Sequence, residues 1–216
     1  MTESLSREVP VKPAETALLL IDVQNYCASR QGGEFKDVPP ASFEEKLGYY
    51  FSSLEQMAVP NMQRLQLACR AARIEVMYTM IQSLTQDGRD RSLDYKITGF
   101  NVPPGSWDAR MLDAIKPAED EIVIPKTSSS VFVSTNIDYV LRNLGVRYLV
   151  IAGIVTDQCI ESAVRDACDL GYLVTLVTDA CTTYTKERHD WALRAIKGYC
   201  RQRSTREFLK ELEALN

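Results

Sequence analysis

The sequence predicts an α/β fold: an open, mostly parallel sheet of five to six strands with helices on both faces, in the three-layer, Rossmann-like arrangement. Short apolar runs rich in β-branched residues alternate with stretches of helical periodicity along the chain, which is typical of βαβ units. Hydrophobic residues make up 45% and charged residues 25% of the chain, an ordinary globular composition. At this length of 216 residues we expect a single domain over residues 1–216.

The strands and helices follow one another in a regular order. The expected strands are Ala17–Asp22, Ile74–Met80, Glu121–Pro125, Tyr148–Ala152 and Leu173–Thr178. The expected helices are Pro60–Arg73, Thr135–Leu144, Asp157–Leu170 and Lys186–Gly198, and a last helix that Ser204 caps and that runs toward Leu215. Gly145 and Gly171 each follow a helical run, where a left-handed residue commonly ends a helix.

Two segments, Cys27–Val59 and Gln82–Trp107, interrupt this order and are expected to be long loops. Loops of this length are uncommon unless they are functional. Both follow the carboxyl end of a strand, which is where open α/β sheets bind ligands. We therefore expect the two segments to wall a ligand pocket.

Charge and cysteine content exclude several classes of protein. The formal net charge of −4 and a pI near 5.2 give no basic footprint for nucleic acid or an anionic membrane. Residues Met1–Ala14 lack the pattern of a signal peptide, and no apolar run approaches the ~20 residues that cross a bilayer. The six cysteines form no C-x-x-C pair, as expected for reduced thiols. We expect a soluble, cytoplasmic protein whose partner is a small molecule.

Three reactive side chains follow strands of the buried type: Asp22, Lys126 and Cys159. With Thr156 as the N-cap, Cys159 lies in the first turn of a helix, where the dipole is expected to lower the pKa of a thiol. Asp22 is a candidate to accept the thiol proton, and Lys126 to stabilise the thiolate. Taken singly, each has an ordinary explanation: a packed thiol, a turn-capping carboxylate and a solvated lysine.

Taken together, the three motifs carry a resemblance. Asp22-x-Gln24, Lys126-x-x-x-Ser130-x-Phe132 and Gly153-x-x-Thr156-x-x-Cys159 resemble, in order and spacing, the isochorismatase-like cysteine hydrolases. That family includes nicotinamidase, N-carbamoylsarcosine amidohydrolase, ureidoacrylate amidohydrolase and biuret hydrolase. The resemblance extends from about Ala14 to Gly198.

The resemblance implies a catalytic triad in which Cys159 is the nucleophile, Asp22 the base and Lys126 its electrostatic partner. It implies a cis peptide between Ile154 and Val155, and an oxyanion hole formed by the backbone N–H groups of Val155 and Cys159. The implied reaction is hydrolysis of a small amide, ureido or carbamoyl compound through a thioester, without a cofactor. It also implies a homo-oligomer, a dimer or tetramer.

Departures from relatives narrow the expected chemistry. Nicotinamidases carry an Asp-x-His metal site, whereas the single histidine here is His189, so we expect no metal. Isochorismatases that cleave a vinyl ether lack the cysteine, so Cys159 favours C–N hydrolysis.

Several further residues are candidates for contacts with substrate or with other subunits. The Gly105-Ser106-Trp107 stretch is similar to one in ureidoacrylate amidohydrolases, so Trp107 is a candidate pocket residue. Arg89 and Arg91 are candidates to hold a substrate carboxylate. Further candidates for the pocket are Gln24, Tyr26 and Gln158. Apolar subunit contacts are expected from Tyr139–Leu144 with Tyr148, and from Tyr49–Phe51, unless these residues fill the core.

Two other functions remain open. A family member that has lost catalysis would act as a binding or scaffold protein, and a single fast-alkylated thiol at Cys159 would argue against it. A nucleotide-binding domain fits the sheet pattern alone, but no Gly-x-Gly-x-x-Gly or Gly-x-x-x-x-Gly-Lys follows any strand. A strong rise in melting temperature with nucleotides would support that reading.

Overall fold

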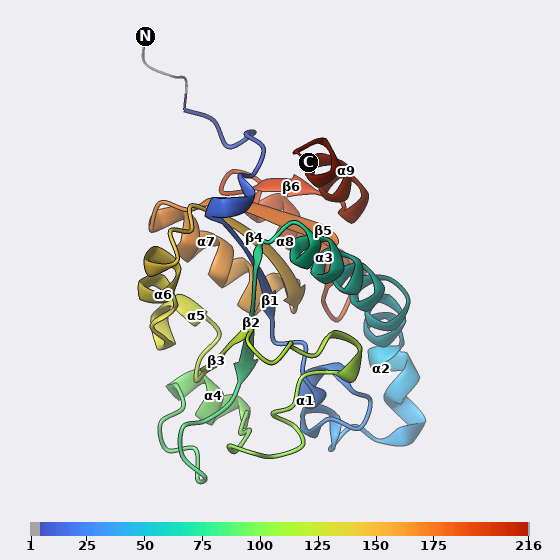
Figure 1. The fold of residues 1–216 in the computed structure, drawn as a ribbon. Coiled ribbons are helices and arrows are strands. Elements are labelled where there is room, and N and C mark those ends of the chain that lie inside the picture. Colours follow the sequence, from blue (N-terminus) through green and yellow to red (C-terminus); the bar gives the residue numbers. More distant parts are fainter. Residues whose placement is uncertain (1–4, 216) are drawn as a thin grey trace.

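A six-stranded parallel sheet lies between two layers of helices in the computed structural model, which describes residues 5–215 (Figure 1). The order of strands across the sheet is β3-β2-β1-β4-β5-β6. The strands are β1 (Thr16–Ile21), β2 (Glu75–Ile81), β3 (Ile122–Lys126), β4 (Tyr148–Ile154), β5 (Leu173–Thr182) and β6 (Arg201–Arg203). The predicted fold class is confirmed, and the predicted domain of residues 1–216 extends beyond the described residues at both ends.

The two central strands, β1 and β4, form the middle of the core. Every residue of both strands is buried, because helices cover both faces of the sheet. They pair in parallel, with Leu18 opposite Val150 and Ile21 opposite Gly153. The strands predicted from apolar runs agree with β1 to β4 to within two residues at each end. β5 continues four residues beyond the predicted end, past a register shift against β4 at Ile151–Gly153.

Helices cover the two faces of the sheet unequally. α3 (Val59–Ala71) and α9 (Thr205–Leu215) contact each other and β5 on one face. The other face carries α5 (Val131–Ser134), α6 (Ile137–Asn143), α7 (Glu161–Asp169) and α8 (Lys186–Ile196) (Figure 1). As predicted, Gly145 and Gly171 are left-handed, with φ of 73° and 93°. Within residues 5–215, none of the helices is long and apolar enough to cross a bilayer.

The expected loop over Cys27–Val59 is largely helical, so that part of the prediction is wrong. α2 (Pro40–Ser53) continues through a π-helical turn, Leu54–Ala58, directly into α3. Pro60, which on the sequence indicates a helix start, stands inside this continuous helix. The π turn makes this possible, because Val59 N–H bonds to Leu54 O, five residues back. The backbone hydrogen-bond pattern of the helix is therefore already shifted at Pro60, which has no N–H to donate.

Shorter elements lie at the carboxyl ends of the strands. α1 (Asn25–Ala28) follows β1, a 3-10 turn covers Gly33–Phe35, and α4 (Leu93–Thr98) interrupts the second segment expected to be a loop. The Ser92 side chain caps α4 by accepting a hydrogen bond from Tyr95 N–H. Two more 3-10 turns, Pro13–Glu15 and Asp113–Ile115, precede β1 and β3.

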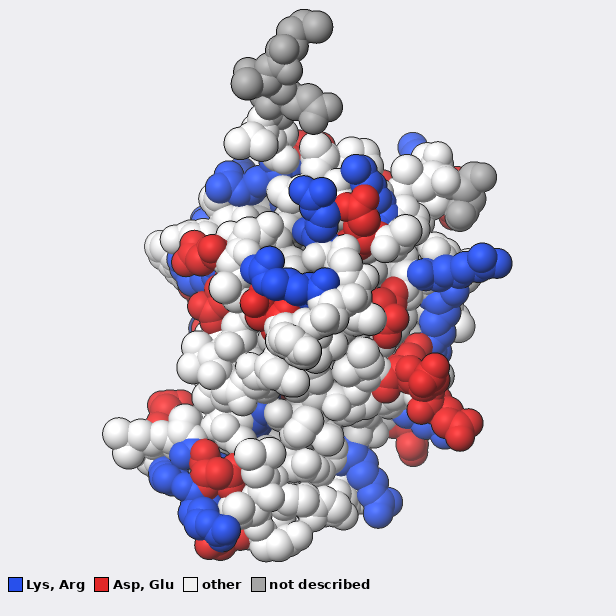
Figure 2. All heavy atoms as spheres, turned by 60° about the vertical axis from the view of Figure 1, so that its left-hand side comes forward, with Lys and Arg blue, Asp and Glu red and all other residues white. Residues whose placement is uncertain are grey.

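The expected apolar contact surfaces are partly core. Tyr50, Phe51 and Tyr148 are buried, so these residues pack inside the domain, and that part of the prediction is wrong. Tyr139 on α6 is 70% exposed, and Tyr49 and Leu144 are each 40% exposed, so these three stay candidates for subunit contact. On the face shown in Figure 2, the charged side chains among the described residues mix acidic and basic groups instead of forming a continuous basic surface.

The strand order places a ligand site at one point of the sheet. β1 leads outward through β2 to β3, and β4 leads the other way through β5 to β6. Chain connections therefore diverge between β1 and β4, and a crevice opens at the carboxyl ends of these two strands. α1 and α4 lie at this edge of the sheet, at the bottom of Figure 1.

Candidate active site

Three reactive side chains meet at this crevice: Asp22, Lys126 and Cys159. Asp22 follows β1, Lys126 ends β3, and Cys159 lies on a π-helical turn, Thr156–Ile160, that follows β4. Lys126 Nζ lies 2.8 Å from Asp22 Oδ2 and donates to Cys159 Sγ at 3.4 Å. The Asp22 carboxylate is also close enough to Cys159 to raise the pKa of its thiol. The structure thus brings the three predicted catalytic residues into one cluster.

The backbone of Asp22 makes a sharp turn that aims its carboxylate at the cluster. Its φ of 59° is in the left-handed region, which aspartate tolerates better than most residues. Thr79 on β2 donates from Oγ1 to Asp22 Oδ1 at 2.8 Å, and Asp22 N–H bonds to Thr79 O at 3.0 Å. One carboxylate oxygen therefore faces Thr79 and the other faces Lys126.

Lys126 is a completely buried ammonium whose hydrogen bonds are met by fixed groups. Besides Asp22 and Cys159, it donates to Ser128 O at 2.9 Å and to Tyr95 Oη at 3.1 Å. Burial by itself would lower the pKa of Lys126, but the Asp22 carboxylate and the Cys159 sulfur raise it well above its ordinary value. The side chain is therefore a permanent positive charge beside the sulfur.

The pKa of the Cys159 thiol is raised, contrary to the expectation from its place at the start of a helix. Burial raises the pKa of Cys159 to about 12, the Lys126 ammonium lowers it, and the Asp22 carboxylate raises it. Desolvation therefore outweighs the helix dipole. Asp22, which shares the Lys126 ammonium with Cys159, is the carboxylate of the cluster.

The backbone between β4 and the cysteine turn is set by two features. The peptide between Ile154 and Val155 is cis, as the resemblance implied. Gly153, with φ of 129°, lies so close to β1 that a Cβ atom there would stand 2.3 Å from Ile21 O. Only glycine fits this approach, which holds the Cys159 turn against the end of β1. Thr156 also hydrogen-bonds through Oγ1 to His189 Nδ1 at 2.8 Å.

Asp22 and Cys159 line a small cavity of about 260 Å³ with the open solvent at its mouth included, of which about 20 Å³, room for about one water molecule, is accessible interior space. Its polar lining residues are Asp22, Cys27, Glu34, Gln158, Cys159 and Tyr184. Apolar side chains complete the wall: Ile81, Phe100, Ile154 and Val155. Cys27 and Glu34 come from one of the two segments expected to wall the pocket and Phe100 from the other, so both contribute.

Two weaker candidates line this cavity and five do not. Val155 and Gln158 line it. Gln24 is buried, and its amide bonds to the backbone of Ile81 and Asp108, while Tyr26 packs edge-on against Phe100. Both therefore support the wall from behind and do not line it.

The residues expected to hold a carboxylate lie elsewhere. Arg89 is exposed and pairs with Asp87 at 3.1 Å. Arg91 donates to the backbone oxygens of Gly88 and Phe100 and so fixes the loop. Trp107 is 45% exposed and does not line the cavity. The only basic side chain that the described structure brings to the reactive centre is that of Lys126.

Sequence reasoning missed two polar residues of the cavity, Glu34 and Tyr184, and the Lys126 partner Tyr95. Glu34 lies in the 3-10 turn after Gly32-Gly33, and Tyr184 follows β5. Tyr184 Oη donates to Glu34 Oε1. The one signal in the sequence was the pair Gly32-Gly33. It lies in the long segment that follows β1 and Asp22.

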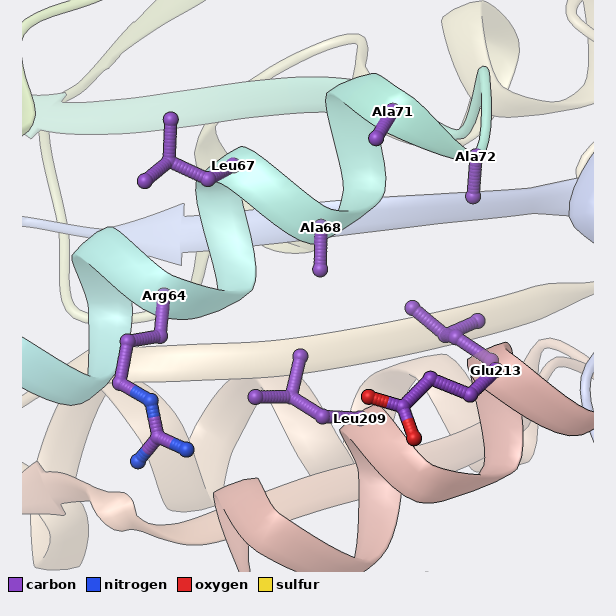
Figure 3. A pocket seen from close by; sticks show the side chains of 8 residues that line it. Arg64, Leu67, Ala68, Ala71, Ala72, Leu209 and Glu213 are labelled. Carbon is purple, nitrogen blue, oxygen red and sulfur yellow. The ribbon is translucent and has the colours of Figure 1, made fainter.

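Two other hollows differ from the cavity in their chemistry. One, about 750 Å³, shares Phe100 and Gln158 with the cavity, so these side chains stand between the two spaces. The other, about 870 Å³, is an open groove between α3 and α9 (Figure 3), lined mainly by small and aliphatic side chains with one Arg and one Glu. That groove has no nucleophile in its wall and lies away from the reactive cluster. Within residues 5–215, no group of His, Cys, Asp and Glu side chains is arranged to hold a metal ion.

Comparison with known proteins decides the family. The family model of the isochorismatase domain matches residues 16–207, which include all three clustered side chains. The chain belongs to the isochorismatase family. Membership identifies it as a hydrolase, and the six-stranded sheet is the fold of that family.

Relatives and solved structures agree with this assignment. Ureidoacrylate amidohydrolase RutB of Agrobacterium fabrum is 31% identical over 196 residues, covering 80% of this chain and 78% of that protein. The RutB protein of Rhizobium rhizogenes is 30% identical over 188 residues, covering 80% and 72%. In fold, the chain is similar to a cysteine hydrolase from Pseudomonas syringae pv. phaseolicola, with a TM-score of 0.78 at 22% identity and full coverage of both chains. N-carbamoylsarcosine amidase from Thermoplasma acidophilum has a TM-score of 0.66 at 21% identity, covering 88% of this chain and 96% of that one.

Proposed function

We propose that this protein is a cysteine-dependent amidohydrolase that cleaves a C–N bond of a small amide, ureido or carbamoyl compound through a thioester. The observation that carries the proposal is the buried cluster of Asp22, Lys126 and Cys159, of which Asp22 and Cys159 line a small cavity. Relatives named ureidoacrylate amidohydrolase support hydrolysis of a C–N bond other than a peptide bond.

The first half of the reaction forms the thioester. Asp22 accepts the proton of the Cys159 thiol as the sulfur attacks the carbonyl carbon. The carbonyl oxygen becomes an oxyanion beside the backbone N–H groups of Val155 and Cys159. Asp22 then returns the proton to the leaving nitrogen, the C–N bond breaks, and ammonia or an amine departs.

The second half regenerates the enzyme. Water attacks the thioester carbon and gives a proton to Asp22, the C–S bond breaks, and the Cys159 sulfur takes that proton back. The balance is one amide and one water consumed for one acid and one amine. Lys126 keeps its charge throughout and stabilises the sulfur whenever it is anionic. No step requires a cofactor or a metal.

Ammonia release tests the proposal. The panel is ureido acids, N-carbamoyl amino acids, biuret and small primary amides, each measured with wild type and with Cys159→Ser. Wild type should release ammonia from at least one class. Hydroxylamine should trap the acyl group as a hydroxamate, which is the signature of a thioester. Turnover by Cys159→Ser at a rate near wild type would overturn the cysteine mechanism.

The alternative, a scaffold that has lost catalysis, is best tested by the same turnover assay. Because burial raises the pKa of Cys159 to about 12, slow alkylation at neutral pH is expected of the enzyme as well. Alkylation rate alone therefore does not separate the two functions. We also propose a cytoplasmic location, which the six unpaired cysteines support. We further propose that the protein is a homo-oligomer, which the exposed Tyr139 supports.

A further inference from the structure

Glu34 places a second carboxylate in the wall of the reactive cavity, and the proposed mechanism does not use it. It lines the same 260 Å³ space as Cys159. Among residues 5–215, Tyr184 is the one hydrogen-bond donor that reaches this carboxylate, and it bonds to Oε1. The second oxygen, Oε2, is therefore left for a group that enters the cavity.

The position of Glu34 is fixed by its neighbours on both sides. Gly32 packs so tightly on α1 that a Cβ atom would stand 2.1 Å from Tyr26 O, and Gly33 N–H bonds to Asp108 Oδ1 at 3.1 Å. Phe35 is buried, with its ring centroid 5.1 Å from that of Phe51. The carboxylate is therefore held by a rigid turn, as a binding group has to be.

The charges around Glu34 do not favour an anionic ligand. Burial is the largest cause that raises the pKa of Glu34, and the hydrogen bond from Tyr184 lowers it. The nearby Asp22 carboxylate raises it further, and the result is a pKa of about 7. No Lys or Arg side chain lines the cavity. Arg188, whose guanidinium lies 5.1 Å from the centre of the Tyr184 ring, is paired with Asp157 at 2.5 Å.

We propose that Glu34 determines specificity by accepting a hydrogen bond from an N–H group on the far side of the substrate from the scissile carbonyl. The preferred substrate then carries a carboxamide, carbamoyl or ammonium group there, and a carboxylate in the same place is rejected by repulsion from Glu34. This inference rests on the proposed function and narrows it. It separates this protein from a hydrolase of ureido acids, because those substrates carry a carboxylate.

The turnover test uses two substrates that differ only at the far group. Malonamide and malonamate share the scissile amide, and malonamate has a carboxylate where malonamide has a second carboxamide. At pH 8, where Glu34 is mainly ionised, wild type should favour malonamide at least tenfold in kcat/KM. Ammonia release from malonamide should stop at one equivalent, because its product is malonamate.

Variants show whether Glu34 causes the preference. Glu34→Gln should lower kcat/KM for malonamide and raise it for malonamate. Ammonia release from malonamide should then exceed one equivalent, because the malonamate product is hydrolysed in turn. The matched control is Glu44→Gln, which removes an exposed carboxylate paired with Arg30 outside the cavity and should leave the ratio within twofold of wild type. A wild-type preference for malonamate, or an unchanged ratio in Glu34→Gln, would overturn the inference.

A second measurement works without turnover and so keeps the two proposals apart. Iodoacetamide and iodoacetate differ only in carrying a carboxamide or a carboxylate, and the labelling of Cys159 by each is read by mass spectrometry of its peptide. The quantity compared is the rate of Cys159 labelling by iodoacetate divided by the rate with iodoacetamide. This ratio should be at least tenfold higher in Glu34→Gln than in wild type. Ammonia release from none of the amides would refute the proposed function, and an unchanged labelling ratio would refute the role of Glu34.

Discussion

Replacing Asp22 by Asn should abolish hydrolysis and yet make Cys159 more reactive toward iodoacetamide. In wild type, the Lys126 ammonium is shared between the Asp22 carboxylate, 2.8 Å away, and the sulfur, 3.4 Å away. Without the carboxylate, the ammonium acts on the thiolate alone, and the repulsion that raises the pKa of Cys159 is gone.

The size of the effect follows from the repulsion that is removed between the Asp22 carboxylate and the Cys159 thiolate, which lie 2.8 and 3.4 Å from the same Lys126 Nζ. At an effective dielectric constant of about 20, like unit charges about 4 Å apart repel by about 4 kcal/mol. That energy corresponds to a thiolate fraction on the order of a thousandfold larger. A more stable thiolate is a weaker nucleophile, which takes back roughly half of the gain on a logarithmic scale. The expected net acceleration is therefore about thirtyfold at pH 7.5.

The assay is the rate of carbamidomethylation of the Cys159 peptide at pH 7.5, beside ammonia release from a substrate of the wild type. Labelling of the buried Cys181 in the same samples is the control, because opening of the fold would accelerate that reaction too. Slower or unchanged labelling of Cys159 in Asp22→Asn would show that Asp22 already holds the thiol proton in the resting enzyme, and the reasoning would be wrong.

Four further outcomes are expected. Cys159→Ser should lower kcat by at least about a thousandfold, whereas EDTA should leave wild-type activity unchanged; loss of activity with EDTA would reveal a metal. Gly153→Ala should destabilise the fold by about 3 kcal/mol or more in urea unfolding, against about 1 kcal/mol for Gly171→Ala, where a Cβ meets open space; equal losses would contradict the close approach to β1. The preference for malonamide should shrink as pH falls through about 7, because Glu34, facing Tyr184, Asp22 and Cys27, then loses its charge; a constant preference from pH 8 to 6 would argue against this. Light scattering should give a multiple of 24.4 kDa, with contacts that include the exposed Tyr139, and a mass near 24.4 kDa would refute the oligomer.

The fold was predictable because the two central strands are buried on both faces. The run Thr16–Ile21 is entirely apolar after its first residue, and helical stretches surround it in the sequence. Such a run is best interpreted as a buried strand of a parallel sheet. The helix over Pro40–Ser53 was not predictable in this way. Pro60 looks like a helix start, and only the π turn before it reveals that the helix continues.

The reactive cluster was predictable for a related reason. In a parallel sheet, residues that follow strands meet at one edge, which made Asp22, Lys126 and Cys159 candidates, and the family resemblance of their motifs implied that they act together. The cavity wall was not, because it depends on how long segments fold over that edge. Arg89 is exposed and pairs with Asp87, whereas Glu34, an ordinary glutamate in the sequence, is turned into the cavity by its packed neighbours. Burial likewise reversed the expected direction of the Cys159 pKa, and burial is a property of the assembled fold.

The divergence of the chain between β1 and β4 also determines when the enzyme becomes reactive during folding. Asp22 and Lys126 belong to the first half of the sheet, and Cys159 belongs to the second half. Neither half alone contains both the sulfur and the groups that handle its proton, and the ammonium of Lys126 loses its water only when the halves close on each other. Chemistry therefore requires the contact between β1 and β4, and a chain that lacks this contact carries a cysteine that is an ordinary thiol.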